Sequence, residues 1–213
     1  MRESIAFVLF LVLVVAAPAR AALTLGVAPE TPTTLLPGGT LSLELRLTEV
    51  IDPGAGSVFD TGDGLVTSEI TAELSGPAAF TALAANTEVF TSELLRAVAF
   101  DATTAAIFQG VAIAEPTGTS GTPLSPDVRF VTLGQVAVTA AADAAPGTEI
   151  VLSLLDNPAF EDTLLADGTV LDAGIAGSTV TLTVVPEPAG AGVAVVAFML
   201  LRRGSFRSPD AVR

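Results

Sequence analysis

The stretch "TLSLELRLTEV", residues 40–50, alternates polar and apolar side chains from Thr40 to Thr48. Leucine occupies every second position from Leu41 to Leu47, and Ser, Glu, Arg and Thr fill the positions between and after them. Successive side chains of a strand point to opposite faces of a sheet. The pattern therefore predicts a strand with one face in the core and the other in solvent. Pro37-Gly38-Gly39 marks a turn directly before it.

Comparable segments recur along the chain and are separated by clusters of Gly, Pro, Asp and Ser. Strands are predicted at residues 23–27, 40–50, 66–74, 80–90, 94–100, 105–114, 128–140, 149–155 and 179–185. Residues 88–98 also match a short helix in part. Many short strands with regular turns predict an all-β fold, an antiparallel β-sandwich formed by residues 22–185.

The composition excludes several kinds of chemistry. The chain has no Cys, His, Trp or Tyr, and all 9 of its basic residues are Arg. Thiolate and imidazole catalysis and the usual metal ligands of those types are therefore absent. The net charge of -14 argues against binding to nucleic acid. We expect no enzymatic activity and no cofactor, and Ca²⁺ is the one ion for which the sequence offers a candidate site.

The turn Asp60-Thr61-Gly62-Asp63-Gly64 is the candidate Ca²⁺ site. Alternating carboxylates with two glycines can wrap oxygen ligands around the ion. No acidic residue stands where an EF-hand loop places its bidentate ligand. The alternative is a solvated turn between two strands.

A second acidic region contains Asp156, Glu161, Asp162 and Asp167. These side chains could ligate a cation, or two of them could pair as the acid and base of a glycan hydrolase. The alternative is a charged loop at one end of the sandwich. The phenylalanines are expected to pack in the core rather than to stack on sugars.

The N-terminus has the three parts of a secretory signal peptide. Arg2 provides the positive charge, residues 5–17 are apolar, and Ala19-Arg20-Ala21 is a cleavage site of the small-x-small type. Residues 1–21 are therefore predicted to be removed on export.

The C-terminus, residues 186–213, has another three-part pattern. Pro186-Glu187-Pro188 is followed by the uncharged residues 189–201 and then by Arg202 and Arg203. As a helix the apolar part spans about 20 Å, which is short for about 30 Å of hydrocarbon. The pattern predicts a short apolar helix that inserts into a membrane transiently.

This order of motif, apolar run and arginines resembles the PEP-CTERM sorting signal. The resemblance implies recognition by an exosortase, a membrane processing enzyme of Gram-negative bacteria. It also implies removal of the tail near the motif, and a path from the inner membrane to the cell surface or the exopolysaccharide matrix. The apolar run is shorter than is usual in that family.

The body of the chain resembles the cohesin-like β-sandwich, a variant of the immunoglobulin-like architecture. Three features carry the resemblance: Pro37-Gly38 before a strand, "LGQVAV" at residues 133–138, and a second turn at Pro146-Gly147. We expect a non-enzymatic exported surface or matrix protein. The alternatives are a cohesin-like module that binds a dockerin-like protein or a polysaccharide, and a carboxylate-dependent glycan hydrolase.

Overall fold

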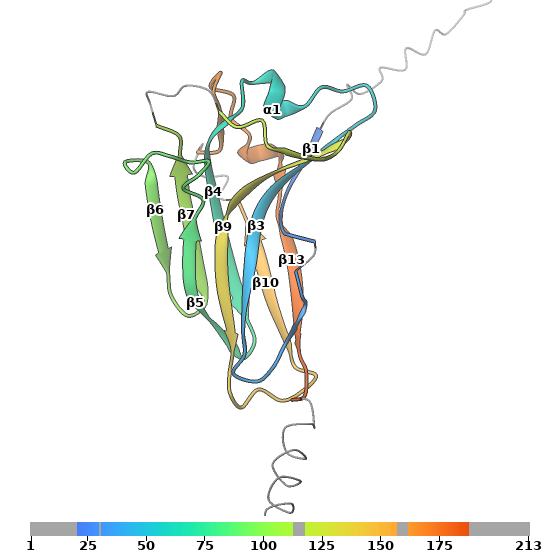
Figure 1. The fold of residues 1–213 in the computed structure, drawn as a ribbon, viewed down its shortest axis with the longest axis vertical. Coiled ribbons are helices and arrows are strands. Elements are labelled where there is room, and N and C mark those ends of the chain that lie inside the picture. The colour runs from blue at the N-terminus through green and yellow to red at the C-terminus, as the bar shows by residue number, and fades with distance from the viewer. Residues whose placement is uncertain (1–20, 30, 113–117, 157–161, 188–213) are drawn as a thin grey trace, which may run out of the picture.

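The computed structural model describes residues 21–29, 31–112, 118–156 and 162–187. The predicted signal peptide before Ala21 and the predicted C-terminal helix lie outside this part of the chain. The described residues fold into two β-sheets that pack face to face (Figure 1). The predicted all-β sandwich is therefore confirmed.

Sheet A is built around the two longest strands, which pair antiparallel along most of their length. Its order is β12 (Ile175–Ala176), β1 (Ala21–Val27), β3 (Thr40–Ile51), β9 (Val128–Ala140) and β5 (Ala78–Ala85), and β8 (Thr122–Ser125) also pairs with β9. Only the β1–β12 pair is parallel.

Sheet B covers the other side of the core. Its order is β2 (Thr34–Leu35), β13 (Ser178–Val184), β10 (Glu149–Leu155), β4 (Leu65–Ser75), β7 (Thr104–Gly110) and β6 (Arg96–Phe100), and β11 (Leu164–Leu165) also pairs with β4. The β13–β2 pair is the parallel one in this sheet.

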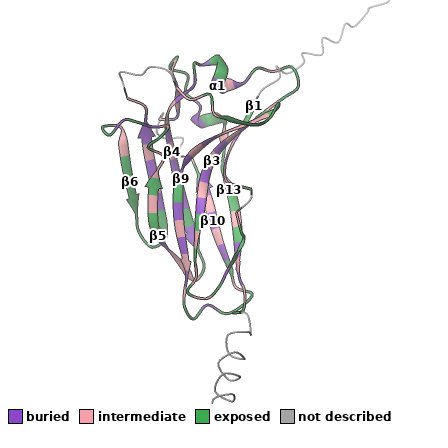
Figure 2. Cartoon of the chain, viewed as in Figure 1, coloured by how far each residue is buried: buried purple, intermediate pink, exposed green. Residues whose placement is uncertain are grey.

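Along the strands of both sheets, buried residues are interspersed with more exposed ones (Figure 2), and the buried apolar residues form one core cluster. On β3, Leu43, Leu45 and Leu47 are at most 1% exposed, as the period of two predicts. On β10 and β13, Leu152 and Leu182 meet them from the opposite sheet as part of the same core cluster. Apolar burial of this kind is the main stabilising contribution to folding.

A bulge on β9 explains why its apolar pattern changes phase. The register passes from Leu45↔Gly134 to Arg46↔Thr132, so Leu133 has no partner on β3. Gly134 is required there, because a Cβ at this position would lie 2.4 Å from the carbonyl oxygen of Ala84. Such bulges change which face of a strand points inward.

A fully buried carboxylate fixes the one short α-helix of the described chain, α1 (Val58–Thr61). Glu49 of β3 accepts a hydrogen bond from the Ser57 hydroxyl at 2.7 Å and another from the backbone N–H of Val58. Ser57 is also the N-cap residue of the helix and accepts from the N–H of Asp60. Glu49 therefore ties this helix to sheet A.

The main departures from the predicted strands lie between residues 86 and 98. β5 ends at Ala85, because the Asn86 side chain accepts from the N–H groups of Glu88 and Val89 and turns the chain. The short helix considered for residues 88–98 is wrong, since β6 occupies the end of that range. Local apolar spacing does not distinguish a turn from a helix in so short a segment.

Candidate functional site

Three aspartates gather where β10 ends. Asp156 follows β10, Asp162 lies two residues before β11, and Asp172 is the first residue of the 3₁₀ helix η1 (Asp172–Gly174). One carboxylate oxygen from each lies within 4.8 Å of the others. Among the described residues, one group of at least three carboxylates is close enough to share a cation, and it consists of these three aspartates.

Strand pairing brings the first two acids together. β10 pairs with β4 as far as Leu155↔Thr71, and β11 pairs with it from Leu164↔Thr67. β7 occupies the other edge of β4 over the same residues, so β10 and β11 share one edge. Leu155 and Leu164 therefore lie opposite positions only four residues apart on β4. Asp156 follows Leu155, and Asp162 lies two residues before Leu164. The two aspartates must therefore be close in space, although residues 157–161 separate them in sequence.

Thr163 connects the cluster to the sheet and is only 1% exposed. Its backbone N–H donates to Asp172 Oδ1 at 3.0 Å, and its hydroxyl makes a long 3.5 Å bond to Asp156 Oδ1. The same hydroxyl accepts from the N–H of Glu69 on β4. The aspartates are thus held in place by neighbours of fixed position.

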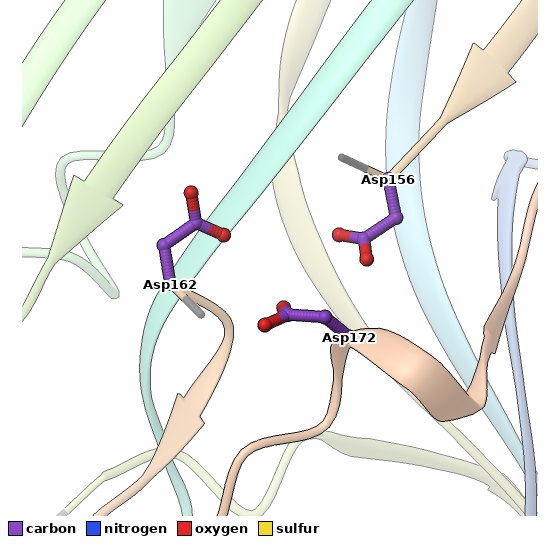
Figure 3. Close-up of side chains that lie close together, drawn as sticks. All are labelled: Asp156, Asp162 and Asp172. Atoms are coloured by element: carbon purple, nitrogen blue, oxygen red, sulfur yellow. The ribbon is translucent and has the colours of Figure 1, made fainter. Parts of the chain in front are cut away.

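Each of the three carboxylates has one oxygen with no hydrogen-bond partner among the described residues. These atoms are Asp156 Oδ2, Asp162 Oδ1 and Asp172 Oδ2, all shielded from solvent. Figure 3 shows the three side chains turned toward a common space. Asp172 is 5% exposed, so water does not freely replace the missing partner. An unpaired oxygen at such a depth is costly.

The electrostatics of the cluster are strongly unfavourable to ionisation. Burial, followed by the charges of Asp172 and Glu69, raises the pKa of Asp156 to about 6. Burial and then a hydrogen bond with Glu69, with further repulsion from the neighbouring acids, raise the pKa of Asp162 to about 8. Both effects disfavour a charged carboxylate.

The basic side chains of the described residues are engaged elsewhere. Arg46 pairs with Glu44 at 2.7 Å and stacks over a phenylalanine ring. Arg129 pairs with Asp60 at 2.6 Å. Arg96 donates to a backbone carbonyl. The cluster must therefore be neutralised by protons or by a cation from solution.

The predicted Ca²⁺ turn at residues 60–64 is placed apart from this cluster. Asp60 lies in α1, where its carboxylate accepts from Arg129. The backbone carbonyls of Gly62, Asp63 and Gly64 all accept hydrogen bonds from other parts of the chain. These oxygens are thus already used in packing. Ca²⁺ binding by Asp60 and Asp63 stays a prediction.

Packing also accounts for the glycines of this turn. A Cβ on Gly62 would lie 2.2 Å from the Leu165 side chain, and one on Gly64 would meet the backbone of Gly118 at 2.4 Å. Gly64 has φ +93°, a conformation that other residues rarely adopt. The Asp/Gly pattern is therefore explained by close approach without any ion.

Of the four acids predicted in the second region, the structure brings together Asp156 and Asp162. Glu161 lies outside the described residues. Asp167 is exposed and instead accepts from the N–H of Thr169 at 2.8 Å in a tight turn. That hydrogen bond holds the pKa of Asp167 below its usual value.

Sequence reasoning missed Asp172 and Glu69. Asp172 stands alone after an apolar residue, and Glu69 occupies an ordinary outward position on a predicted strand. Neither has a local pattern that could have identified it. The pairing of β4 with β10 and β11 places Glu69 beside the cluster, and η1 places Asp172 there, where it accepts from the N–H of Thr163.

Two shallow cavities of about 400 and 390 Å³ lie on the outer face of sheet A, away from the acidic cluster. Both are lined by Gln135, and the second also by Glu44 and Arg46. Glu44 accepts from Arg46 and from the Thr132 hydroxyl. Neither cavity contains the paired acids that a glycan hydrolase requires.

The predicted sorting motif begins where the sandwich ends. The N–H of Val185 donates to Leu35 at 2.7 Å, and Pro186 and Glu187 beyond it are exposed. Since β10 and β13 are antiparallel, this exit is at the opposite end of the sandwich from Asp156 (Figure 1). Pro188, Arg202 and Arg203 lie outside the described residues.

Comparisons with known proteins identify the fold. No family model matches the sequence, and no curated protein matches it. The third cohesin of ScaC from Acetivibrio cellulolyticus superposes with a TM-score of 0.52 and 9% identity, over 78% of this chain and 99% of that one. The sixth cohesin of scaffoldin B from the same organism gives 0.50 and 13%, over 76% and 98%.

A third match, the OlpC cohesin of Clostridium thermocellum, has a TM-score of 0.50 and 9% identity, over 80% of this chain and 99% of that one. The described sandwich therefore has a cohesin-like fold, and it accounts for nearly the whole of each cohesin module. At these identities the likeness concerns the fold alone.

The described residues contain no helix whose length and apolar character would let it cross a bilayer. The apolar segment predicted to insert, residues 189–201, lies outside them.

Proposed function

We propose that this protein is an exported binding module of cohesin-like fold that takes a protein partner and has no catalytic role. The observation that carries the proposal is the match over 99% of the ScaC cohesin with a TM-score of 0.52. That cohesin is described in complex with a dockerin, as are the other two modules. A dockerin-like protein is accordingly the first partner to test, and a polysaccharide is the second.

We propose the outer face of sheet B as the surface that contacts the partner protein. At one edge, β7 and β6 present Ala97, Ala99, Ala106 and Phe108 outward, since the Ala97↔Phe108 and Ala99↔Ala106 pairs flank the pair that contains the buried Ile107. This surface is formed by three short side chains and one phenylalanine. Protein interfaces need such broad complementary surfaces rather than a cleft.

A binding assay with the full-length protein tests this proposal. The immobilised chain is incubated with extracellular material from its source organism, and each captured protein is then produced separately and titrated by calorimetry. We expect one partner to bind saturably. Ala99→Arg on sheet B should weaken binding by at least about tenfold, because a buried unpaired charge is costly at an interface.

The matched control is Ser42→Arg, an exposed position on the outer face of sheet A. It adds the same side chain to the opposite face and should leave the affinity unchanged. The proposal fails if no captured protein binds the purified chain saturably. Saturable binding to an isolated glycan instead would identify a polysaccharide-binding module.

Export and C-terminal sorting form the second part of the proposal. The exposed position of Pro186 and Glu187, immediately after the last strand, supports access by a processing enzyme such as an exosortase. Membrane insertion of residues 189–201 would then be transient, and the product would reach the cell surface or matrix. Intact-mass measurement of surface-located protein tests processing.

We expect the surface form to lack residues 1–21 and the tail beyond the Pro-Glu-Pro motif. Replacing Pro186, Glu187 and Pro188 with alanine should retain the tail and keep the protein in the membrane fraction. Glu73→Ala, an exposed change on β4, is the control and should be processed normally. A surface form of the unmodified protein that still carries the tail would contradict the sorting proposal.

A further inference from the structure

We propose that Asp156, Asp162 and Asp172 together bind one Ca²⁺ ion at the end of sheet B, independently of the partner-binding function. The carboxylates come from three separate elements, and their nearest oxygens all lie within 4.8 Å of one another. Oxygen-only ligand sets suit hard divalent cations.

The decisive observation is Asp172, which is 95% buried and has one unpaired oxygen. Its Oδ1 accepts from Thr163, while its Oδ2 has no partner among the described residues. Figure 3 shows its carboxylate beside those of Asp156 and Asp162. A buried carboxylate oxygen that lacks a donor is compensated by a proton, an ordered water or a metal ion. The other two aspartates each also have one shielded oxygen without a partner among the described residues.

The spacing of the cluster fits Ca²⁺. Ca²⁺–oxygen distances of 2.3–2.6 Å place ligands on opposite sides of the ion about 4.6–5.2 Å apart. The limit of 4.8 Å falls within that range, so the three oxygens are near enough to one another to contact a single Ca²⁺ ion. For Mg²⁺ the corresponding separation is about 4.0–4.2 Å, and its octahedral geometry is stricter.

A positive charge for this cluster would have to come from an ion in solution. The mature chain has no Lys or His, and the three described arginines contact other groups. Glu69 lies next to Asp162 and adds further negative charge. A divalent cation would neutralise this site and provide the partners that the three oxygens lack.

Thermal unfolding of the full-length protein, stripped with a chelator, tests the proposal. The chain has neither Trp nor Tyr, so calorimetry or far-ultraviolet circular dichroism replaces intrinsic fluorescence. At a Ca²⁺ concentration about 100 times Kd, Tm should rise by about 5–10 °C, because the ion binds only the folded state. Isothermal titration should give one site per chain.

Asp172→Asn and Asp156→Asn should each abolish the Ca²⁺-dependent shift and the titration signal. Two variants are needed because either alone could affect folding. The matched controls are Glu73→Gln on β4 and the double variant Asp60→Asn/Asp63→Asn, and both should keep the full shift.

Four results would overturn the proposal. The first is no Ca²⁺-dependent rise in the Tm of the unmodified chain, which would mean that protons alone neutralise the cluster. The second is an unchanged rise in both cluster variants, and the third is loss of the rise in the Asp60/Asp63 double variant. The fourth is an equal rise in Tm with Mg²⁺ at the same concentration.

Discussion

Glu49 and Asp172 are two deeply buried carboxylates with opposite environments. Glu49 is fully buried, and both of its oxygens accept hydrogen bonds from the N-terminus of α1. Asp172 is nearly as buried, yet only one of its oxygens has a partner among the described residues, and its nearest acidic neighbours repel it.

The difference separates a structural carboxylate from a ligand-binding one. Glu49 completes a helix N-terminus, where unpaired N–H groups attract negative charge. Asp172 accepts one hydrogen bond from the N–H of Thr163, but its other oxygen has no donor among the described residues, and its carboxylate lies beside those of Asp156 and Asp162. A buried acid whose hydrogen bonds are complete belongs to the scaffold, whereas one with an unpaired oxygen indicates a ligand.

The largest expected effect comes from removing the satisfied carboxylate. Glu49→Gln should lower the free energy of unfolding by about 2–3 kcal/mol, because an amide cannot accept from both the Ser57 hydroxyl and the Val58 N–H. Denaturant unfolding measures the change. Glu73→Gln is the exposed control and should alter stability by less than about 0.5 kcal/mol. Equal losses in both variants would mean that Glu49 does not anchor α1.

The unsatisfied carboxylate should respond in the opposite direction. In chelator at neutral to mildly alkaline pH, Asp172→Asn should raise the free energy of unfolding by about 0.5–2 kcal/mol, because it removes like-charge repulsion and keeps the acceptor for Thr163. In saturating Ca²⁺ the same variant should be less stable than the unmodified protein. If it is destabilised equally in both buffers, Asp172 is structural in the same way as Glu49.

A carboxylate paired with arginine should show a third behaviour, visible in the pH dependence of stability. Burial alone would raise the pKa of Glu44, but hydrogen bonds from Arg46 and Thr132 hold it below 4.5. Because the pKa is lower in the folded state, the stabilisation is present above pH 4.5 and is lost as the pH falls through the folded-state value.

Glu44→Gln should therefore cost about 0.5–1 kcal/mol at neutral pH and nothing in strong acid. Chemical unfolding across this pH range measures the difference between the two proteins. A deficit that persists below the folded-state pKa would mean that the loss comes from packing rather than from charge.

The smallest effect is expected at the exposed pair of Arg129 and Asp60, whose side chains are 26% and 46% exposed. Arg129→Ala should change stability by less than about 0.5 kcal/mol, since solvent screens such pairs. Added salt should remove what difference remains. A loss of more than about 1 kcal/mol in the free energy of unfolding would mean that this pair contributes to stability as a buried carboxylate does.

The strands were predictable because side-chain alternation is a local property. Thr40–Ile51 and Glu149–Leu155 carry the pattern in their own residues, and the structure confirms both. The bulge at Leu133 was visible only as a phase change in the apolar pattern of β9. The turn after Ala85 was missed because it depends on one Asn side chain that caps the backbone.

The candidate site was predictable only in part. Asp156 and Asp162 stood out because they belong to an acidic region, whereas the Asp/Gly turn at Asp60 and Asp63 had the stronger local pattern. The structure explains those glycines by close packing and places the buried Asp172 beside the first pair. A short pattern cannot separate a ligand-binding turn from one shaped by its neighbours.

The sequence by itself determined the alternating strands, the all-β class and a chain with far fewer basic than acidic residues, because these depend only on local order and composition. Tertiary structure alone decided which acids remain uncompensated. β4 aligns β10 with β11 and so joins Asp156 to Asp162, and η1 adds Asp172 from further along the chain. Pairing between distant residues sets those neighbours, and electrostatic interaction depends on distance in space rather than in sequence.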